Sequence, residues 1–240
     1  MGDLGINLLA SAIWYVLGLG TTRALQFIKT YGSKQFWRPF LKGKGTLAVV
    51  LTDKPGAQPR SPRKISLTDV QAFSDVRSVL ASLGRNVEIK SGSSADMDQL
   101  QKDSFVSLGG PKANGVSDHV LSRLADRLPV RYDAAEGCFF FGGGQFRAAY
   151  SPSGLVTQDY GLIIRLLKLD RNGPDAKPAL VVFGLHGHGT EQAIKAITAN
   201  AHLARTLKPH IKQDLFAFLK FDFVEHKCIK SEIIGANSIP

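Results

Sequence analysis

The sequence predicts an α/β protein with a Rossmann-like, doubly wound, mostly parallel sheet, preceded by one N-terminal transmembrane helix. Three observations support this prediction. Short, almost wholly apolar runs recur along residues 46–240, as in strands that are buried on both faces of a parallel sheet. Loops that contain glycine follow several of these runs, and helical patterns follow the loops. A run of 19 residues without charge, 4–22, precedes all of them.

Residues 1–22 form the predicted transmembrane helix. A helix of 19 residues is about 28 Å long, close to the thickness of the hydrocarbon core of a bilayer. Residues 23–64 hold ten of the 30 Lys and Arg residues and a single acid, Asp53. By the positive-inside rule, this basic flank predicts a single-pass protein of the cell membrane with its N-terminus outside and its bulk in the cytosol. A cleaved signal peptide and a buried N-terminal helix are the alternatives.

Residues 23–45 are predicted to be a basic juxtamembrane segment. Its aromatic residues Phe27, Trp37 and Phe40 are expected among the lipid headgroups, while its Lys and Arg side chains meet anionic lipids. A nucleic-acid groove with interleaved aromatic residues is the alternative. The position directly after an uncharged run favours the bilayer, so nucleic acid is not an expected partner.

The remaining residues, 46–240, are predicted to be one cytosolic domain. Residues 46–52 suit a strand and 53–64, with three prolines, a loop. Apolar residues at helical spacing predict a helix over 66–84, which Ser66 or Thr68 caps and Gly84 ends. Further strands are expected at 86–92, 105–108, 129–133, 179–184 and 214–227, with helices after 115 and 190. Residues 137–160 predict a hairpin or meander, and 161–169 a strand or a short helix.

The loop 109–115 carries the first group of predicted ligand-binding residues. Ligands of open α/β sheets bind beyond the carboxyl ends of the strands, where this loop is expected. Gly109 and Gly110 would let the backbone approach a ligand, and Lys112 would meet a phosphate at the start of the next helix. Asn114 would contact a base or ribose, or cap that helix. The alternative is an ordinary turn that connects a strand to a helix and binds no ligand.

The loop 184–190 carries the second group, which is Gly187, His188, Gly189 and Thr190, with Thr190 as the expected helix cap. This loop matches neither the Walker pattern nor the dinucleotide-binding fingerprint. No metal is expected, because the sequence offers no complete set of His and Cys ligands, and no cofactor is assigned. A plain turn between a strand and a helix is again the alternative.

Four residues are candidates for catalysis. His186 and His188 are candidate acid–base groups, because imidazole titrates near neutral pH. Asp159 and Glu136 are candidate carboxylate partners, although both are also common loop residues. No known catalytic motif accompanies them, so the sequence leaves open whether the protein is an enzyme.

These features predict a membrane-anchored sensor or signalling module whose cytosolic domain binds a nucleotide or another phosphate-bearing ligand. The order of strand, glycine loop and helix resembles Rossmann-like nucleotide-recognition domains that bacteria attach to membrane helices, but no motif assigns a family. The expected partners are the bilayer, anionic lipid headgroups, a nucleotide-like molecule and further copies of the chain. The alternatives are a membrane-anchored nucleotide or N-glycoside hydrolase that uses His186 and His188, and a tethered interaction domain without a small ligand.

Overall fold

The computed structural model describes residues 34–42, 45–52, 65–170, 177–199 and 201–240. The predicted transmembrane helix, together with Phe27 and Asp53, lies outside these residues. Within the described ranges, no helix is both long and apolar enough to cross a membrane. The membrane span and the cellular location therefore stay predictions.

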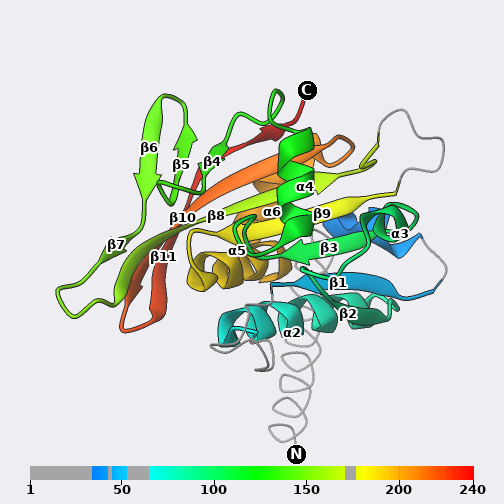
Figure 1. Ribbon diagram of the computed structural model, residues 1–240, viewed down its shortest axis with the longest axis horizontal. Coiled ribbons are helices and arrows are strands. Elements are labelled where there is room, and N and C mark those ends of the chain that lie inside the picture. Colours follow the sequence, from blue (N-terminus) through cyan, green and yellow to red (C-terminus); the bar gives the residue numbers. More distant parts are fainter. Residues whose placement is uncertain (1–33, 43–44, 53–64, 171–176, 200) are drawn as a thin grey trace, which may run out of the picture.

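The fold is α/β and is built on one mixed sheet of eight strands (Figure 1). The strand order is β11–β10–β8–β9–β3–β1–β2, and β7 pairs with β8. The strands are β1 (Leu47–Leu51), β2 (Val87–Ser91), β3 (Phe105–Leu108), β7 (Ala149–Tyr150), β8 (Val156–Leu166), β9 (Ala179–Gly184), β10 (Leu215–Val224) and β11 (Lys227–Ser238). Strands β2, β1, β3 and β9 are parallel neighbours. Because β7, β9 and β10 all run antiparallel to β8, six of the eight strands of this sheet point the same way.

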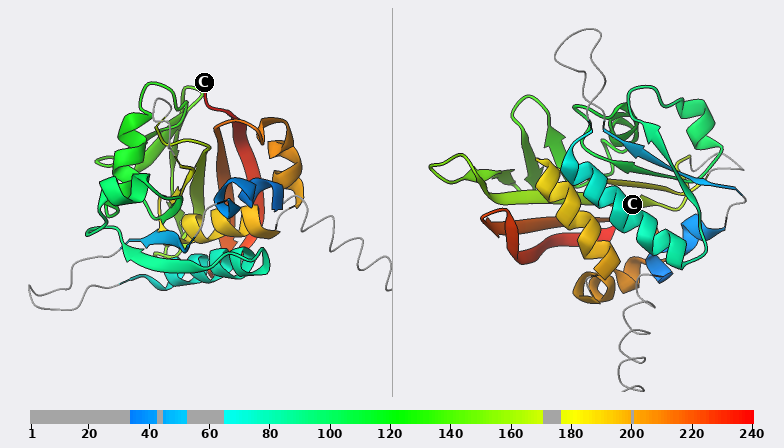
Figure 2. Two further views of the ribbon diagram at one scale, coloured as in Figure 1. Left: turned by 90° about the vertical axis from the view of Figure 1, so that its right-hand side faces the viewer. Right: turned by 90° about the horizontal axis from the view of Figure 1, so that it is seen from below.

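Helices and a small second sheet cover both faces of the large sheet (Figure 2). One face carries the 3-10 helix η1 (Arg38–Leu41), α2 (Leu67–Ser82), α5 (Gly187–Ala199) and α6 (Ala201–Leu207), which leads into the 3-10 helix η2 (Lys208–His210). The other face carries α3 (Met97–Gln101), α4 (Gly115–Arg123) and the sheet β4 (Arg131–Asp133), β5 (Cys138–Phe141) and β6 (Gly144–Arg147). Alternate side chains of a strand point to opposite faces, so strands covered on both sides must be apolar throughout.

Strand β1 shows this arrangement clearly. Leu47, Val49 and Leu51 pack into the core beneath α2 and α5, whereas Ala48 and Val50 pack into the core beneath α4. All five side chains are buried. The apolar run that predicted a doubly covered strand is therefore explained by burial on both faces.

The helix α2 follows the prediction closely. The Ser66 hydroxyl accepts a hydrogen bond from the Asp69 N–H at 3.1 Å, which satisfies one of the unpaired donors of the first turn. Gly84, two residues after the last helical residue, has φ +80°, a conformation that glycine adopts without strain. The predicted Ser66 cap and the end of the helix before Gly84 are confirmed.

The structure decides between the two predictions for residues 161–169, and it contains one strand, β11, that the sequence did not predict. Residues 161–166 belong to the strand β8 and not to a helix. The predicted terminal strand is β10, but a second strand, β11, follows it through a tight turn in which Glu225 and His226 have positive φ angles of 47° and 67°. The sequence did not predict β11, because an edge strand with exposed side chains lacks the apolar run of a buried strand.

The core begins earlier in the chain than residue 46. Phe36, Trp37 and Phe40 are buried in the core beneath α2 and α5, with Trp37 and Phe40 at 0% exposure. The expectation that Trp37 and Phe40 lie among lipid headgroups is therefore wrong. Aromatic side chains beside Lys and Arg also suit a short amphipathic segment that packs on a protein core, and the sequence does not separate the two environments.

Candidate ligand-binding sites

The loop between β9 and α5 lies at the carboxyl edge of the sheet, as predicted, but an internal carboxylate occupies the start of the helix. Asp159, on the neighbouring strand β8, has no exposed surface. Its Oδ2 accepts hydrogen bonds from the N–H groups of Gly189 at 2.6 Å and His186 at 3.3 Å, and its Oδ1 accepts one from Tyr160 at 2.8 Å. Asp159 therefore satisfies the N–H groups that a bound anion would use.

Burial raises the pKa of Asp159 to about 7, and the hydrogen bonds from the backbone N–H groups of Tyr160, Gly189 and His186 limit the rise. The carboxyl group thus titrates near neutral pH while it is enclosed by the loop. Because it has no exposed surface, Asp159 positions the loop and does not face a ligand.

The glycines of this loop allow close packing. A Cβ atom on Gly187 would lie 2.0 Å from Thr68 Oγ1 of α2, and one on Gly189 would lie 2.3 Å from the carbonyl oxygen of Tyr160. A Cβ on Gly184 would lie 2.6 Å from Gly189 Cα. The loop therefore packs tightly between α2 and β8. Close packing explains why glycine occupies each of these positions, and this explanation requires no ligand.

Thr190 also has a role inside the fold. Its hydroxyl accepts a hydrogen bond from the Gly184 N–H at 2.9 Å and is buried. The helix begins at Gly187, three residues before the predicted cap. Thr190 thus ties the first turn of α5 to the end of β9. Ligand contact by Gly187, Gly189 or Thr190 stays a prediction.

The two histidines lie at the surface and have different neighbours. His186 Nε2 lies 2.5 Å from the hydroxyl oxygen of Tyr150, an exposed residue of β7. The His188 ring lies 5.6 Å, between centroids, from both Phe223 and His226 near the β10–β11 turn. The structure brings His186 to Asp159 through the backbone N–H of His186.

Glu136 lies in the turn between β4 and β5, on the small sheet. Its carboxylate pairs with Arg147 of β6, and both side chains are about half exposed. The contacts of Glu136 are therefore within the small sheet, and none joins it to the loop 184–190.

The loop 109–115 is shaped mainly by internal contacts. Gly109 has φ +104°, and a Cβ atom there would lie 1.7 Å from Thr52 Oγ1 at the end of β1. The Asn114 side chain has no exposed surface: it donates to the carbonyl oxygen of Leu108 at 3.0 Å and accepts from the N–H groups of Val116 and Ser117 at 3.1 and 3.4 Å. Asn114 is thus the cap of α4, which was one of its two predicted roles.

The outer part of this loop borders a cavity of about 420 Å³ between α4 and the small sheet. Lys112 and Arg131 line it, but so does Asp118, and none of its lining residues comes from the loop 184–190. Gly110 lies near the end of β9, since a Cβ atom there would be 3.4 Å from the Phe183 ring. The two loops are neighbours without sharing this cavity.

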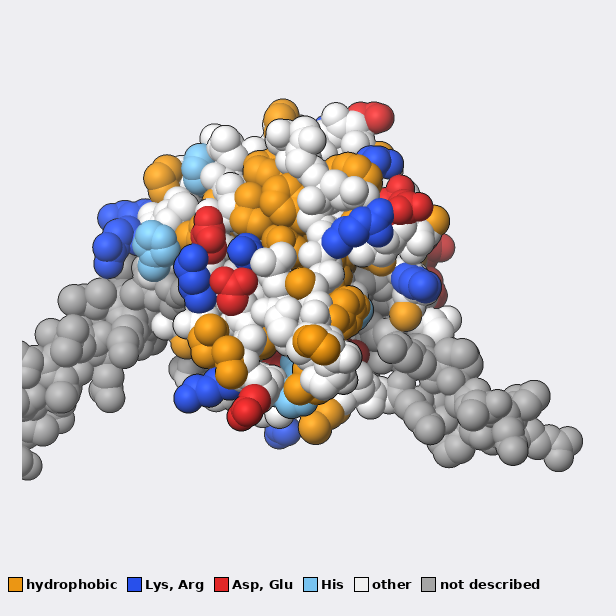
Figure 3. Space-filling model, turned by 90° about the vertical axis from the view of Figure 1, so that its left-hand side faces the viewer, with side chains coloured by type: hydrophobic (Ala, Val, Ile, Leu, Met, Phe, Trp, Pro, Cys, Tyr) orange, Lys and Arg blue, Asp and Glu red, His pale blue; other side chains and the backbone are white. Residues whose placement is uncertain are grey.

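The surface beside these loops has no excess of one charge. Figure 3 shows the side that carries the β7–β8 and β10–β11 turns, where a broken band of hydrophobic side chains has charged groups of both signs on either side. Four large apolar or aromatic residues of these turns are exposed: Tyr150, Leu155, Val224 and Ile229. Such a surface offers little electrostatic attraction for a phosphate.

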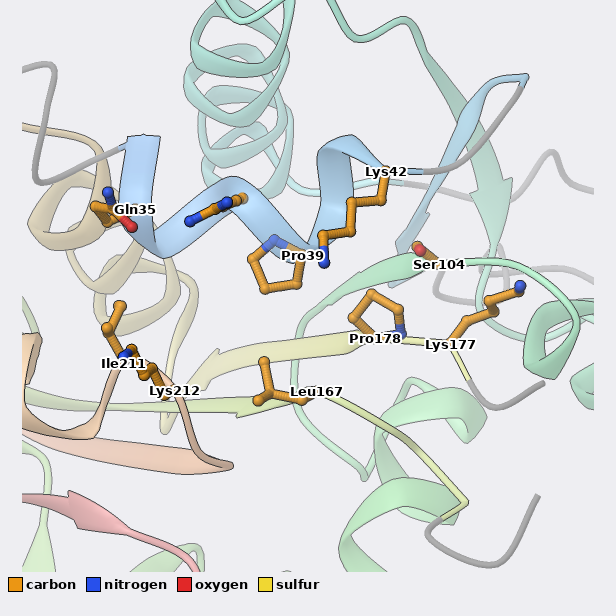
Figure 4. Close-up of a pocket in the computed structure, with 10 residues that line it drawn as sticks. Gln35, Pro39, Lys42, Ser104, Leu167, Lys177, Pro178, Ile211 and Lys212 are labelled. Atoms are coloured by element: carbon orange, nitrogen blue, oxygen red, sulfur yellow. The ribbon is translucent and has the colours of Figure 1, made fainter. Parts of the chain in front are cut away.

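A different cavity, at the opposite edge of the sheet, is strongly basic (Figure 4). We call it the basic cavity. Its volume is about 590 Å³, and its lining residues are Gln35, Arg38, Pro39, Lys42, Ser104, Leu167, Lys177, Pro178, Ile211 and Lys212. Four of them are Lys or Arg, and no acidic residue is among them. The volume lies within the range of small-molecule sites, and the charges favour an anion.

The topology explains how the four cations come to line one cavity. Arg38 and Lys42 come from the segment around η1, whereas Lys177 precedes β9 and Lys212 precedes β10. Because β3, β9 and β10 point the same way, the residues that precede them gather at one edge. This is the amino edge of these strands, where the sequence predicted no ligand.

A buried arginine holds the wall of the basic cavity in place. Arg165 of β8 has no exposed surface; its guanidinium donates to the carbonyl oxygens of Phe36 at 3.1 Å, Ile211 at 2.6 Å and Gln213 at 3.1 Å. Burial lowers the pKa of Arg165 to about 10, so the group stays protonated at neutral pH. Arg165 therefore links the η1 segment to the loop before β10 and adds a positive charge behind the cavity.

The sequence indicated only two of the four cationic residues of the basic cavity. Arg38 and Lys42 stood out in the basic segment 23–45 and were assigned to lipid headgroups. Lys177 and Lys212 gave no signal, since each is a single Lys in a polar loop and only the strand order brings them together. A search for basic residues just before buried strands would have selected both.

Within the described part of the chain, no group of three His, Cys, Asp or Glu residues could hold a metal ion. Compared with protein families, curated proteins and solved structures, the chain shows no significant match to any of them.

Proposed function

We propose that the chain is a membrane-anchored sensor or signalling module whose Rossmann-like domain binds a phosphate-bearing ligand, and that the basic cavity holds this ligand. The observation that carries the proposal is the set of Arg38, Lys42, Lys177 and Lys212 around one cavity, with no acid among its described lining residues. Charge-assisted hydrogen bonds from Lys and Arg are the strongest that a protein offers to a phosphate. The doubly wound arrangement and the single membrane span belong to this proposal.

The cavity also suits a sensor. Four of its lining residues belong to the segment that joins the folded domain to residues 1–33: Gln35, Arg38, Pro39 and Lys42. A ligand in the cavity would contact this segment together with Lys177 and Lys212 of the domain. Binding would thus act directly on the segment that leads to the predicted transmembrane helix. Assembly of several copies of the chain is one way in which the effect of binding would be transmitted.

The proposal is tested by measuring ligand binding to the full chain in a mild detergent. Pyrophosphate and a panel of nucleotides and cyclic nucleotides are titrated, and thermal stability is recorded. We expect stabilisation by at least one of these anions. The Lys177→Ala and Lys212→Ala substitutions should each weaken its binding about tenfold, because each removes one hydrogen bond to a charged group.

The matched control is Lys227→Ala with Lys230→Ala. Both lysines are exposed on β11, near the other edge of the sheet, and the double control removes one positive charge more than either test variant. It should leave binding unchanged. Absence of stabilisation by every anion tested, or equal weakening by the control, would refute the proposal.

The hydrolase alternative is supported by one pair of residues. His186 Nε2 and Tyr150 Oη are 2.5 Å apart at the surface of the carboxyl edge, so an acid–base pair stands next to the start of α5. In this case Asp159 would position the backbone of His186, as it does here at 3.3 Å. Turnover of a nucleotide panel that is abolished by His186→Ala and by Tyr150→Phe, in variants of unchanged stability, would favour the enzyme.

A further inference from the structure

We propose that the phosphate bound in the basic cavity belongs to the headgroup of an anionic membrane lipid. This inference rests on the proposed function, since it names the source of the phosphate in the same cavity. Its basis is the position of the cavity in the chain and the chemistry of its lining.

The position brings the cavity near the predicted bilayer surface. Only 13 positions separate Thr22, the end of the uncharged run, from Gln35 in the cavity wall. Such a segment spans about 20 Å as a helix and at most about 45 Å when extended. If residues 4–22 cross the membrane, the cavity lies within reach of the headgroups of the same leaflet.

The charges around the cavity continue those of the preceding segment. Arg23, Lys29 and Lys34 come between the uncharged run and the cavity wall, and no acidic residue accompanies them. Arg38 and Lys42 extend this series into the cavity itself. Basic residues in this position attract the anionic lipids of the cytosolic leaflet.

The lining suits a lipid better than a nucleotide. Between the cations lie four apolar residues: Pro39, Leu167, Pro178 and Ile211. The uncharged polar residues of the lining are Gln35 and Ser104, and no aromatic side chain is among the lining residues. A base is usually held by stacking and by several polar groups, whereas a lipid presents a phosphate together with apolar acyl chains.

The test follows lysine accessibility in the full chain reconstituted into vesicles. One set contains phosphatidylcholine alone, and the others contain phosphatidylglycerol in increasing proportion. An amine-reactive reagent labels the lysines, and mass spectrometry measures the labelling of Lys177 and Lys212, with Lys227 and Lys230 as internal controls. We expect phosphatidylglycerol to protect Lys177 and Lys212 severalfold while the labelling of the control lysines stays constant.

The Lys177→Ala variant tests how strongly one cation contributes to lipid binding. In Lys177→Ala, half-protection of Lys212 should require about five times more phosphatidylglycerol, the contribution of one cation near an anionic surface. The Lys230→Ala variant should behave like the unmodified chain. An equal thermal stability of the two variants excludes misfolding as the cause.

A final arm, with pyrophosphate in neutral vesicles, separates this inference from the proposed function. Protection by pyrophosphate without protection by phosphatidylglycerol would overturn the lipid inference and leave the proposed function standing. Protection by phosphatidylglycerol, with or without pyrophosphate, supports the inference. Protection of all four lysines alike by phosphatidylglycerol would show general contact with the vesicle surface and would overturn it. Protection by neither compound would overturn the lipid inference, and the nucleotide titrations described above would then decide the proposed function.

Discussion

The Asp159→Asn substitution tests whether the carboxyl group beneath the loop 184–190 is protonated near neutral pH. In the folded protein the pKa of Asp159 is about 7, whereas its ordinary value is 3.8. A difference of about three units corresponds to about 4 kcal/mol. Because the folded-state pKa is the higher one, the folded protein binds the proton more tightly than the unfolded chain does.

The sign of the pH dependence follows from this. The contribution of Asp159 to stability is fully present below about pH 4 and is lost as the pH rises through about 7. The free energy of unfolding of the unmodified chain, relative to Asp159→Asn, should therefore fall by about 4 kcal/mol between pH 4 and pH 8. The asparagine variant lacks the titration and should also lose part of the hydrogen bonding to Gly189 or Tyr160.

Urea unfolding measured at a series of pH values checks this prediction, with the fluorescence of the buried Trp37 as the signal. Asp118→Asn, at an exposed position of α4, is the matched control and should show the same pH dependence as the unmodified chain. If the unmodified chain gains stability relative to Asp159→Asn between pH 4 and 7, the backbone N–H groups keep Asp159 ionised in the folded state. The reasoning from burial would then be refuted.

Two further substitutions, with Gly110→Ala as the control for the second, test the packing around the candidate sites. Trp37→Ala should lower the free energy of unfolding by about 3–5 kcal/mol, because the Trp37 side chain has no exposed surface. Urea unfolding followed by circular dichroism measures this loss. A loss below about 1 kcal/mol would contradict the assignment of residues 36–40 to the core. Gly189→Ala should cost about 3 kcal/mol and lower the melting temperature by several degrees, since its Cβ would lie 2.3 Å from a backbone oxygen. Gly110→Ala, with its nearest contact at 3.4 Å, should change the melting temperature by less than about 2 °C, and equal shifts for the two variants would refute the packing role of Gly189.

The local pattern of residues determined most of the secondary structure. Helix α2 and its Ser66 cap could be predicted because capping and apolar spacing act over a few neighbouring residues. The same holds for β1, β3 and β9, whose burial on both faces demands continuous apolar runs. Strand β11 could not be predicted, because it depends on pairing with β10 and has no apolar run of its own.

The chemistry of the candidate sites was decided by tertiary structure. The sequence placed His186 correctly between a strand and a helix, whereas Gly187 and Gly189 belong to the first turn of α5. It contains no sign that Asp159, from a strand about 30 residues earlier, occupies the start of that helix. It likewise gave no sign that Lys177 and Lys212 line one cavity with Arg38 and Lys42. Charges far apart in the chain come together only when strand order sets which ends are neighbours, and that order depends on the packing of the whole sheet.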